Sequence, residues 1–374
     1  MLMANFSSIF IFLSFYASCF ALNKLRVLPH INSETSRIGY IDGLRGVAAT
    51  LVVCAHSWRI SYSESFERKW FYDSLNFDHR LGAVGVQLFF CITGYLFITK
   101  LLNNKNQKWD KFFIARFKRL APAYFFTVTI LIFVTFFKSS SFGLSDVVSS
   151  IKLYAFGLLG TDLSVPGFNG TELFSVLWSL PYEWKFYFMM PAVAACLHAR
   201  WTTIMAVISA VFSVLIVLYL DGSSFGALFV AGALAAYLDR RIQLNNLLLR
   251  YAIFFASLAL LVYVTSLDLN NYGIGRLSVA SLFFISVIVT KPKILCDSSL
   301  RFMGEISYSV YLLHILCYFF FANLFDIYLS TTTLPAYALA YSLFTCIVCS
   351  LSFKYIEHPF IKKSITAIHS GVKA

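Results

Sequence analysis

The chain has 374 residues, of which 59% are hydrophobic and 13% charged, and its mean hydropathy is +0.74. Soluble globular domains average about 45–50% apolar and about 25% charged residues. The composition therefore excludes an ordinary soluble enzyme and predicts an all-α integral membrane protein. The net charge of +12 fits basic cytoplasmic loops, where Lys and Arg accumulate. We expect a lipid bilayer as the partner, and no nucleic acid.

Apolar segments long enough to cross a bilayer follow one another along most of the chain. A spanning helix needs about 20 mostly apolar residues. An additional apolar stretch at residues 6–22 is an eleventh span or a signal-like segment. The sequence thus predicts ten core transmembrane helices, with an eleventh at the N-terminus left open. The ten segments are about 44–60, 82–100, 119–137, 175–197, 202–220, 224–238, 246–266, 277–290, 305–326 and 334–352.

The distribution of basic residues orients these predicted spans. If residues 23–45 lie inside and the spans alternate, 21 of the 30 Lys and Arg residues fall on the inner side and seven on the outer side. This asymmetry predicts a cytoplasmic C-terminus. It also favours an uncleaved N-terminal helix, because a cleaved signal would invert every later span. The outer loop at about 138–174 is long enough to fold over a pore mouth.

The expected organisation is a single membrane domain with short extensions. Residues 1–40 form an apolar segment and linker, residues 41–363 the transmembrane domain, and residues 364–374 a cytoplasmic tail. The eight cysteines show neither zinc-ligand spacing nor a disulfide framework. We therefore expect no metal site.

Arg45 and His56 stand out in the otherwise apolar first core span. Ionisable residues inside a membrane are costly and usually functional. Eleven residues correspond to three helical turns plus about 20°, so the two side chains share one face, about 16 Å apart along the axis. This separation suits a long donor with an anionic head and a reactive far end, which is the shape of acyl-coenzyme A. The alternative is an interfacial arginine and a core histidine.

Arg116 and Arg119 are three residues apart at the cytoplasmic start of a predicted span. Residues at this spacing are neighbours on a helix face, and guanidinium groups can bind phosphates through two parallel hydrogen bonds. The pair is a candidate phosphate site. An ordinary basic flank is the alternative.

Two further ionisable residues are predicted near mid-membrane. Glu183 falls about 12 Å into a span entered from outside, and Pro181 should kink or loosen that helix. His314 lies at a similar depth in a span entered from the cytoplasm, where a core histidine is the alternative. Glu357 lies at the predicted inner surface, where a structural ion pair is the default interpretation.

Six motifs occur in order across residues 42–361: DGLRGVAATLVVCAH, GVQLFFCITGYL, FFIARFKRLAPAYF, LWSLPYEWKFYF, FMGEISYSVYLLH and YIEHPFI. Together they resemble the transmembrane acyltransferase 3 family, which O-acylates sugars and other envelope or secreted molecules. The resemblance implies an O-acetyltransferase of the bacterial inner membrane, acting on a surface carbohydrate such as O-antigen or exopolysaccharide. The carbohydrate is either free or lipid-linked.

The resemblance also implies roles for individual residues. Arg45 and His56 fit the family's Arg-x10-His motif, and Arg116 and Arg119 fit its Arg-x-x-Arg motif. We expect acyl-CoA, most simply acetyl-CoA, to dock its phosphates on the three arginines as a donor substrate, with no permanently bound cofactor. His56 then acts as general base on the acceptor hydroxyl or first accepts the acyl group itself, and the sequence leaves both open.

Other motif positions are expected to assist. Glu183 sits where the family places Glu in its Ser-x-x-Glu-Trp run, and it is expected to orient the imidazole or hold the sugar. Asp42, Tyr308 and His314 are candidates for supporting roles. Gln87 is a departure, because members commonly carry Asp or Glu there.

Two other function classes remain as alternatives. A proton-coupled transporter or flippase of an envelope precursor would use the same buried ionisable residues as a proton relay, although no inverted repeat is visible. A non-catalytic scaffold of a polysaccharide assembly complex would leave His56 replaceable. Within the enzyme class, the acceptor is a glycan, a lipid-linked sugar, a lipo-oligosaccharide or a small secreted metabolite.

Overall fold

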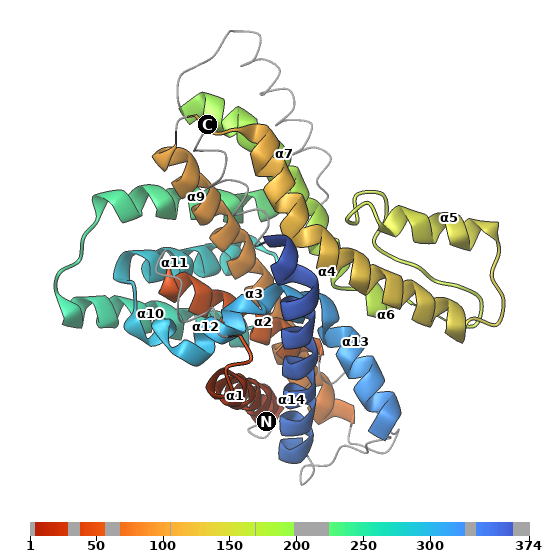
Figure 1. The fold of residues 1–374 in the computed structure, drawn as a ribbon. Helices are drawn as coiled ribbons and strands as arrows, with labels where there is room; N and C mark the ends of the chain where they lie inside the picture. Colours follow the sequence, from red (N-terminus) through yellow and green to blue (C-terminus); the bar gives the residue numbers. More distant parts are fainter. Residues whose placement is uncertain are drawn as a thin grey trace.

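The computed structural model describes residues 4–28, 38–56, 68–104, 106–168, 170–197, 224–325 and 334–361. This described part is helical, and its only β-type pairing is an isolated bridge between Val165 and Phe168. The predicted span at 202–220 and the tail at 364–374 lie outside it. The helices are α1 (Ala4–Lys24), α2 (Gly39–His56), α3 (Arg68–Asn103), α4 (Trp109–Lys138), α5 (Leu144–Leu153), α6 (Thr171–Phe174), α7 (Leu180–Leu197), α9 (Ser224–Arg241), α10 (Leu247–Ser266), α11 (Ile274–Thr290), α12 (Ser298–Glu305), α13 (Ser307–Phe325) and α14 (Leu334–Ser352) (Figure 1).

Fewer helices meet a strict test for membrane spans than the ten that the sequence predicts. Among the described residues, four segments are long and apolar enough to span a membrane. The helices α12 and α13, which are bent by 71° relative to each other, make a fifth span if the two count as one. The helical membrane protein is supported in this coarser form, and the number of ten core helices is not confirmed. One physical reason is that α2 and α7 carry Arg45 and Glu183, which lower their apolarity. The four segments that pass the test are Phe77–Asn103, Trp109–Lys138, Leu247–Ser266 and Pro335–Ile361.

The predicted N-terminal helix is present and belongs to the bundle. α1 packs against α2, α12 and α14 (Figure 1). The Cys54 thiol on α2 donates to the Ser8 carbonyl oxygen at 3.5 Å, and the sulfur atoms of Cys19 and Cys346 lie 3.4 Å apart. The apolar stretch therefore forms part of the same core as the later helices.

The N-terminal end of α2 is held by close backbone packing. A Cβ atom added to Gly304 on α12 would lie 1.9 Å from the Asp42 carbonyl oxygen, and one added to Gly43 would lie 1.9 Å from the Leu295 carbonyl oxygen. Small residues allow helix backbones in membranes to approach this closely. The two glycines thereby fix the position of the turn that carries Arg45.

α2 and α13 run side by side in the same direction. A guanidinium nitrogen of Arg45 lies 3.0 Å from the Ser307 hydroxyl, and farther along both helices the rings of His56 and His314 are 3.1 Å apart at their nearest nitrogens. Because both contacts advance towards the helix C-termini, the pair is parallel. The predicted common face of Arg45 and His56 is therefore the face that α13 covers.

One local prediction needs correction. α7 begins at Leu180, so Pro181 occupies the first turn and does not kink the helix. Proline is well tolerated in the first turn of a helix, where its missing N–H costs little. The predicted span at 305–326 matches α13, which follows the separate helix α12 after a bend at Ile306.

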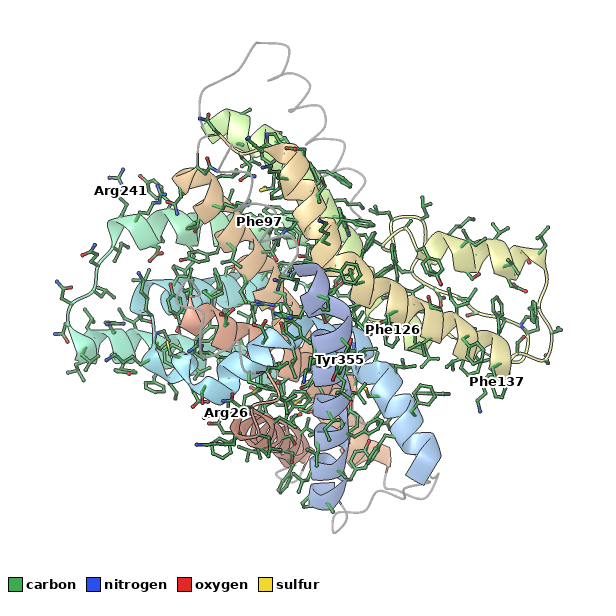
Figure 2. All side chains as sticks on the ribbon, viewed as in Figure 1. Arg26, Phe97, Phe126, Phe137, Arg241 and Tyr355 are labelled. Carbon is green, nitrogen blue, oxygen red and sulfur yellow. The ribbon has the colours of Figure 1, made fainter. Side chains whose placement is uncertain are left out.

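The segment after α4 folds back along that helix. α5 lies beside the C-terminal half of α4 (Figure 1), where the Tyr124 hydroxyl donates to the Leu153 carbonyl oxygen at 2.6 Å. Phe126 and Phe137 of α4 point outward with 40% and 77% of their surface exposed, while Phe97 lies inside the bundle (Figure 2). Such exposed aromatic side chains are expected where a helix faces lipid.

Candidate active site

A cavity of about 330 Å³ opens between α2, α3, α4, α7 and α13. Its volume lies at the lower end of the range found for small-molecule sites, roughly 300–1,000 Å³. Four of the charged groups that line it are cationic and one is acidic. Those residues are Arg45, Lys100, Arg116, Arg119 and Glu183. The structure thus brings together the three arginines and the glutamate that the sequence singles out from three separate motifs.

Arg45 is held by two neighbours. One guanidinium nitrogen lies 3.4 Å from a carboxylate oxygen of Asp42, one turn earlier on α2, and the other donates to the Ser307 hydroxyl at 3.0 Å. The Arg45 and Asp42 side chains keep 16% and 14% of their surface exposed. Arg45 is therefore in contact with Asp42 on its own helix and with Ser307 on α13, and a supporting role of Asp42 stays a prediction.

Arg116 and Arg119 present two guanidinium groups from the same face of α4. Arg116 lies over the Phe97 ring at 5.2 Å from the ring centre. Arg119 makes no ion pair and no hydrogen bond with any described residue, although its side chain lines the cavity. A partly buried guanidinium that donates no hydrogen bond within the described residues can bind an anionic ligand, and arginine is the residue best shaped for phosphate.

Glu183 lies among these cations. The Tyr187 hydroxyl, one turn later on α7, donates to the Glu183 carboxylate. Arg116 and Arg119 are both close enough to act electrostatically on this carboxylate. No hydrogen bond or ion pair joins Glu183 to His56 within the described residues. Glu183 therefore lies beside the arginines in the cavity, and a different residue contacts His56.

That residue is His314. Its Nε2 lies 3.1 Å from Nδ1 of His56, and the two ring centres are 5.1 Å apart with a 53° angle between the planes. His314 is completely buried, whereas His56 is half-buried at the end of α2. His314 is therefore in direct contact with His56, and its supporting role stays a prediction.

Backbone carbonyl groups set the tautomers of the two rings. Nδ1 of His314 lies 2.9 Å from the Val310 oxygen and 3.0 Å from the Tyr311 oxygen, so this nitrogen carries the proton. Nε2 of neutral His314 is then an acceptor, and Nδ1 of His56, which also lies 3.0 Å from the Val52 oxygen, donates. Nε2 of neutral His56 is consequently the nitrogen with the lone pair. This is the form of imidazole that can take up a proton.

The cavity ends one helical turn before the histidine pair. Tyr311 lines it and lies three residues before His314, a rise of about 4.5 Å. The Tyr311 hydroxyl lies 2.6 Å from that of Ser179, which also lines the cavity, and donates to the Val176 oxygen at 2.9 Å. Neither His56 nor His314 lines the cavity itself.

Tyr308 and Glu357 occupy the wall behind the arginines. Tyr308 lines the cavity and donates to the Leu120 oxygen at 3.0 Å. Glu357 is buried in a π-helical turn and accepts a hydrogen bond from Ser309. Instead of the expected ion pair, the structure shows this hydrogen bond, with Arg119 acting on the carboxylate electrostatically.

Gln87 lies away from the cavity. Its side-chain amide donates to the Asn271 carbonyl oxygen at 2.7 Å, in the loop between α10 and α11, and its own amide oxygen has no hydrogen-bond partner. Val86 and Phe89, its neighbours on the other face of α3, line the cavity instead. The structure therefore gives Gln87 no contact with the predicted chemistry.

Several lining residues were not singled out from the sequence. Tyr187 follows Glu183 by four residues and Tyr311 precedes His314 by three, so helical spacing from a known candidate would have identified both. Lys100 lies in the last turn of α3, and Ser179 precedes α7 in a short 3-10 turn (Leu177–Ser179). No sequence signal separates these last two from other polar residues.

Comparison with known proteins agrees with the geometry. Residues 38–354 match the acyltransferase domain family that the six motifs resemble. O-acetyltransferase OatA of Staphylococcus aureus strain NCTC 8325 is 26% identical over 76% of this chain and 54% of its own length. A provisionally named O-acetyltransferase, SACOL0978 of S. aureus strain COL, is 25% identical over 88% of this chain and 58% of its own length. No solved structure matches.

The chain spans slightly more than half the length of these curated relatives. The family match covers most of the present chain and contains every cavity-lining residue described above. It also contains both histidines. The chain therefore belongs to the acyltransferase 3 family.

Proposed function

We propose that this protein is a membrane O-acetyltransferase that moves an acetyl group from acetyl-CoA to a hydroxyl of a surface or secreted carbohydrate. The observation that carries the proposal is the cation-lined cavity that ends one turn from a buried histidine pair. Family membership and the names of the relatives support the reaction type.

The donor binds with its phosphates at the cationic part of the cavity. Arg45, Arg116 and Arg119 come from two helices and offer their guanidinium groups to one space, with Lys100 adding a further charge. Charge-assisted hydrogen bonds to phosphate are about twice as strong as neutral ones. The thin pantetheine arm then extends along the cavity between α3, α7 and α13 towards Tyr311, which brings the thioester near the histidine pair.

His56 performs the proton transfer. Its Nε2 lone pair takes the proton of the acceptor hydroxyl, whose oxygen attacks the thioester carbonyl carbon. The C–S bond breaks, and the departing CoA thiolate receives the proton, which leaves an O-acetyl ester and free CoA. His314 is a positioning residue that fixes the tautomer of His56. Direct transfer and transfer through an acetyl-imidazole on Nε2 both fit this geometry.

Glu183 belongs to the donor cavity in this scheme. It offsets part of the positive charge of Arg116 and Arg119 and is oriented by Tyr187. A cavity with four cations and one carboxylate still favours a polyanionic ligand. This assignment replaces the expectation that Glu183 orients the imidazole.

The location follows from the charge distribution along the chain. The basic residues place Arg45 and Arg116 near the cytoplasm, where acetyl-CoA is made, if the membrane is the bacterial inner membrane. The histidine end of α2 then points to the outer side. The acceptor, an O-antigen, exopolysaccharide or lipid-linked sugar, approaches from there.

Mass spectrometry of cell-envelope glycans tests the proposal. Deletion strains would carry wild type, His56→Ala, His358→Ala or empty vector, with His358 serving as a histidine outside the cavity. We expect an acetyl mass increment with wild type and His358→Ala only. An increment that survives His56→Ala removes His56 from its role. If no strain shows an increment and purified protein consumes no acetyl-CoA, the enzyme proposal fails, and proton-driven movement of an envelope precursor becomes the next measurement.

A further inference from the structure

A cluster of four aromatic side chains lies beside the deep end of the cavity. Trp178 comes from the 3-10 turn before α7, Tyr182 from α7, Phe225 from α9 and Tyr272 from the loop between α10 and α11. The Trp178 ring centre is 5.5 Å from that of Tyr272 and 5.4 Å from that of Phe225. Phe225 and Tyr272 are 4.8 Å apart. Four separate elements thus contribute to one aromatic surface.

This surface adjoins the cavity at the end away from Arg116. Phe90 lines the cavity, and its ring centre lies 5.8 Å from that of Phe225. Ser179, the residue after Trp178, lines the same end. Arg116 lies over Phe97, about two turns farther along α3 from Phe90. The aromatic cluster and the guanidinium groups therefore border different ends of one space.

Two members of the cluster combine a partly exposed ring with a polar group that can bind a ligand. Trp178 and Tyr272 are both partly exposed, whereas Phe225 is buried. The indole N–H of Trp178 and the hydroxyl of Tyr272 make no hydrogen bond with any described residue. Tyr182 differs, because the Lys185 ammonium group lies 5.5 Å from its ring centre. Trp178 and Tyr272 are the two rings that a neutral ligand can contact.

An aromatic belt at the membrane interface would explain exposed Trp and Tyr residues in general. Belt residues project singly towards lipid headgroups. Here Tyr272 contacts Trp178 and Phe225 edge-on, with interplanar angles of 72° and 76°, and Trp178 contacts Phe225 in a tilted arrangement at 47°. The rings converge on one another next to a cavity, which is the arrangement of a binding surface.

We propose that Trp178 and Tyr272 bind a sugar ring of the acceptor. A pyranose presents an apolar C–H face that suits the electron-rich face of an aromatic ring, and its hydroxyls suit the free indole N–H and phenol groups. The neutral surface separates the acceptor from the cationic donor site, so the two substrates meet near Tyr311 and the histidine pair. This inference rests on the proposed O-acetyl transfer and adds the acceptor subsite to it.

Acceptor saturation measured with purified full-length protein tests the subsite. The acceptor probe is the envelope glycan fraction of a deletion strain after mild alkaline removal of O-acetyl groups, and product is the acetyl ester formed from labelled acetyl-CoA. Trp178→Ala and Tyr272→Ala should each raise the half-saturating glycan concentration about tenfold, with KM for acetyl-CoA within about twofold of wild type. Tyr263→Ala is the matched control, because this tyrosine is 62% exposed on α10.

The outcomes separate the subsite from the proposed function. If wild type acetylates the glycan and both variants saturate as wild type does, the subsite is wrong and the transferase stands. If wild type acetylates no glycan, the acceptor subsite and the proposed O-acetyl transfer are both wrong. Should Trp178→Ala not fold, Tyr272→Phe keeps the ring and loses only the hydroxyl, and Trp178→Phe keeps an aromatic ring, although a smaller one, and loses the N–H. Each should raise half-saturation about threefold, and unchanged saturation in both would overturn the subsite.

Discussion

The two ends of the α2–α13 pair differ in what their side chains contact. At one end, Arg45 and Ser307 face a cavity lined by cations from three helices. At the other end, His56 and His314 contact each other and backbone carbonyl groups. The first region is charged, partly exposed and open to a ligand. The second is compact, and His314 has none of its surface exposed.

The difference indicates that one end of this helix pair is suited to ligand binding and the other end to proton transfer. Side chains that bind an anionic ligand need free hydrogen-bond donors, and Arg119 has them. A ring that accepts a proton must be held in one tautomer and orientation, which backbone carbonyls achieve because they move little. We therefore expect substitutions at the two ends to change different kinetic constants.

The largest expected effect is that of His56→Ala. Removing a general base typically costs about 10²–10⁴-fold in rate, so kcat should fall by that order while KM for acetyl-CoA stays close to wild type. Release of CoA thiol, followed at varied acetyl-CoA, measures both constants. A raised KM with an unchanged kcat would place His56 in donor binding and remove the contrast between the two regions.

Arg119→Ala should produce the opposite pattern. A hydrogen bond to a charged group contributes about 1.5–3 kcal/mol, so KM for acetyl-CoA should rise about 10- to 100-fold with little change in kcat. Dephospho-CoA analogues should lose less affinity than acetyl-CoA if Arg119 binds a phosphate. Arg241→Ala is the control, because Arg241 is exposed on α9 and lies at the periphery (Figure 2). Equal effects of both variants would rule out a specific donor contact.

His314→Phe tests whether the second histidine positions the first. Loss of one buried hydrogen bond should lower kcat about tenfold, and His314→Gln should recover part of this loss because its amide oxygen can accept from Nδ1 of His56. Wild-type activity should fall as the pH is lowered, since protonated His56 has no lone pair, and the acidic limb should move in His314→Phe. Identical pH profiles in wild type and His314→Phe would contradict a positioning role.

The smallest expected effect is that of Ser307→Ala, which removes the hydrogen bond that Arg45 donates to α13. Arg45 keeps its charge and its contact with Asp42, so only the positioning of the guanidinium is weakened, and KM for acetyl-CoA should rise about two- to tenfold. Ser286→Ala is matched, because its hydroxyl is also buried and hydrogen-bonded, to Ser257 on α10. Thermal unfolding checks that both variants are equally stable. If Ser286→Ala raises KM as much, the effect of Ser307→Ala reflects a general loss of helix packing and not the loss of its contact with Arg45.

Relations within one helix were predictable from the sequence. The spacing of Arg45 and His56 placed them on one face, and that face is the one that contacts α13. Arg116 and Arg119 were expected as neighbours, and both line the cavity. These predictions succeed because an α-helix turns about 100° per residue whatever surrounds it. The start of α7 at Leu180, which puts Pro181 in the first turn, was mispredicted, because hydropathy alone does not locate a helix terminus.

Relations between helices were not predictable in the same way. Glu183 and His314 were both placed at the depth of His56, and nothing in the sequence decided which of them touches the imidazole. The partner of His56 is 258 residues away in the chain. Tyr272 in the aromatic cluster comes from a loop outside the six motifs.

By itself, the sequence determined the membrane class, the family and the identity of the charged and titratable side chains, because composition, hydropathy and motif order are local properties. The tertiary structure decided which of those side chains meet. Backbone contact at Gly43 and Gly304 fixes the N-terminal end of α2, and the parallel packing of α2 on α13 pairs His56 with His314. Such contacts depend on the packing of helices far apart in the chain, which no single segment encodes.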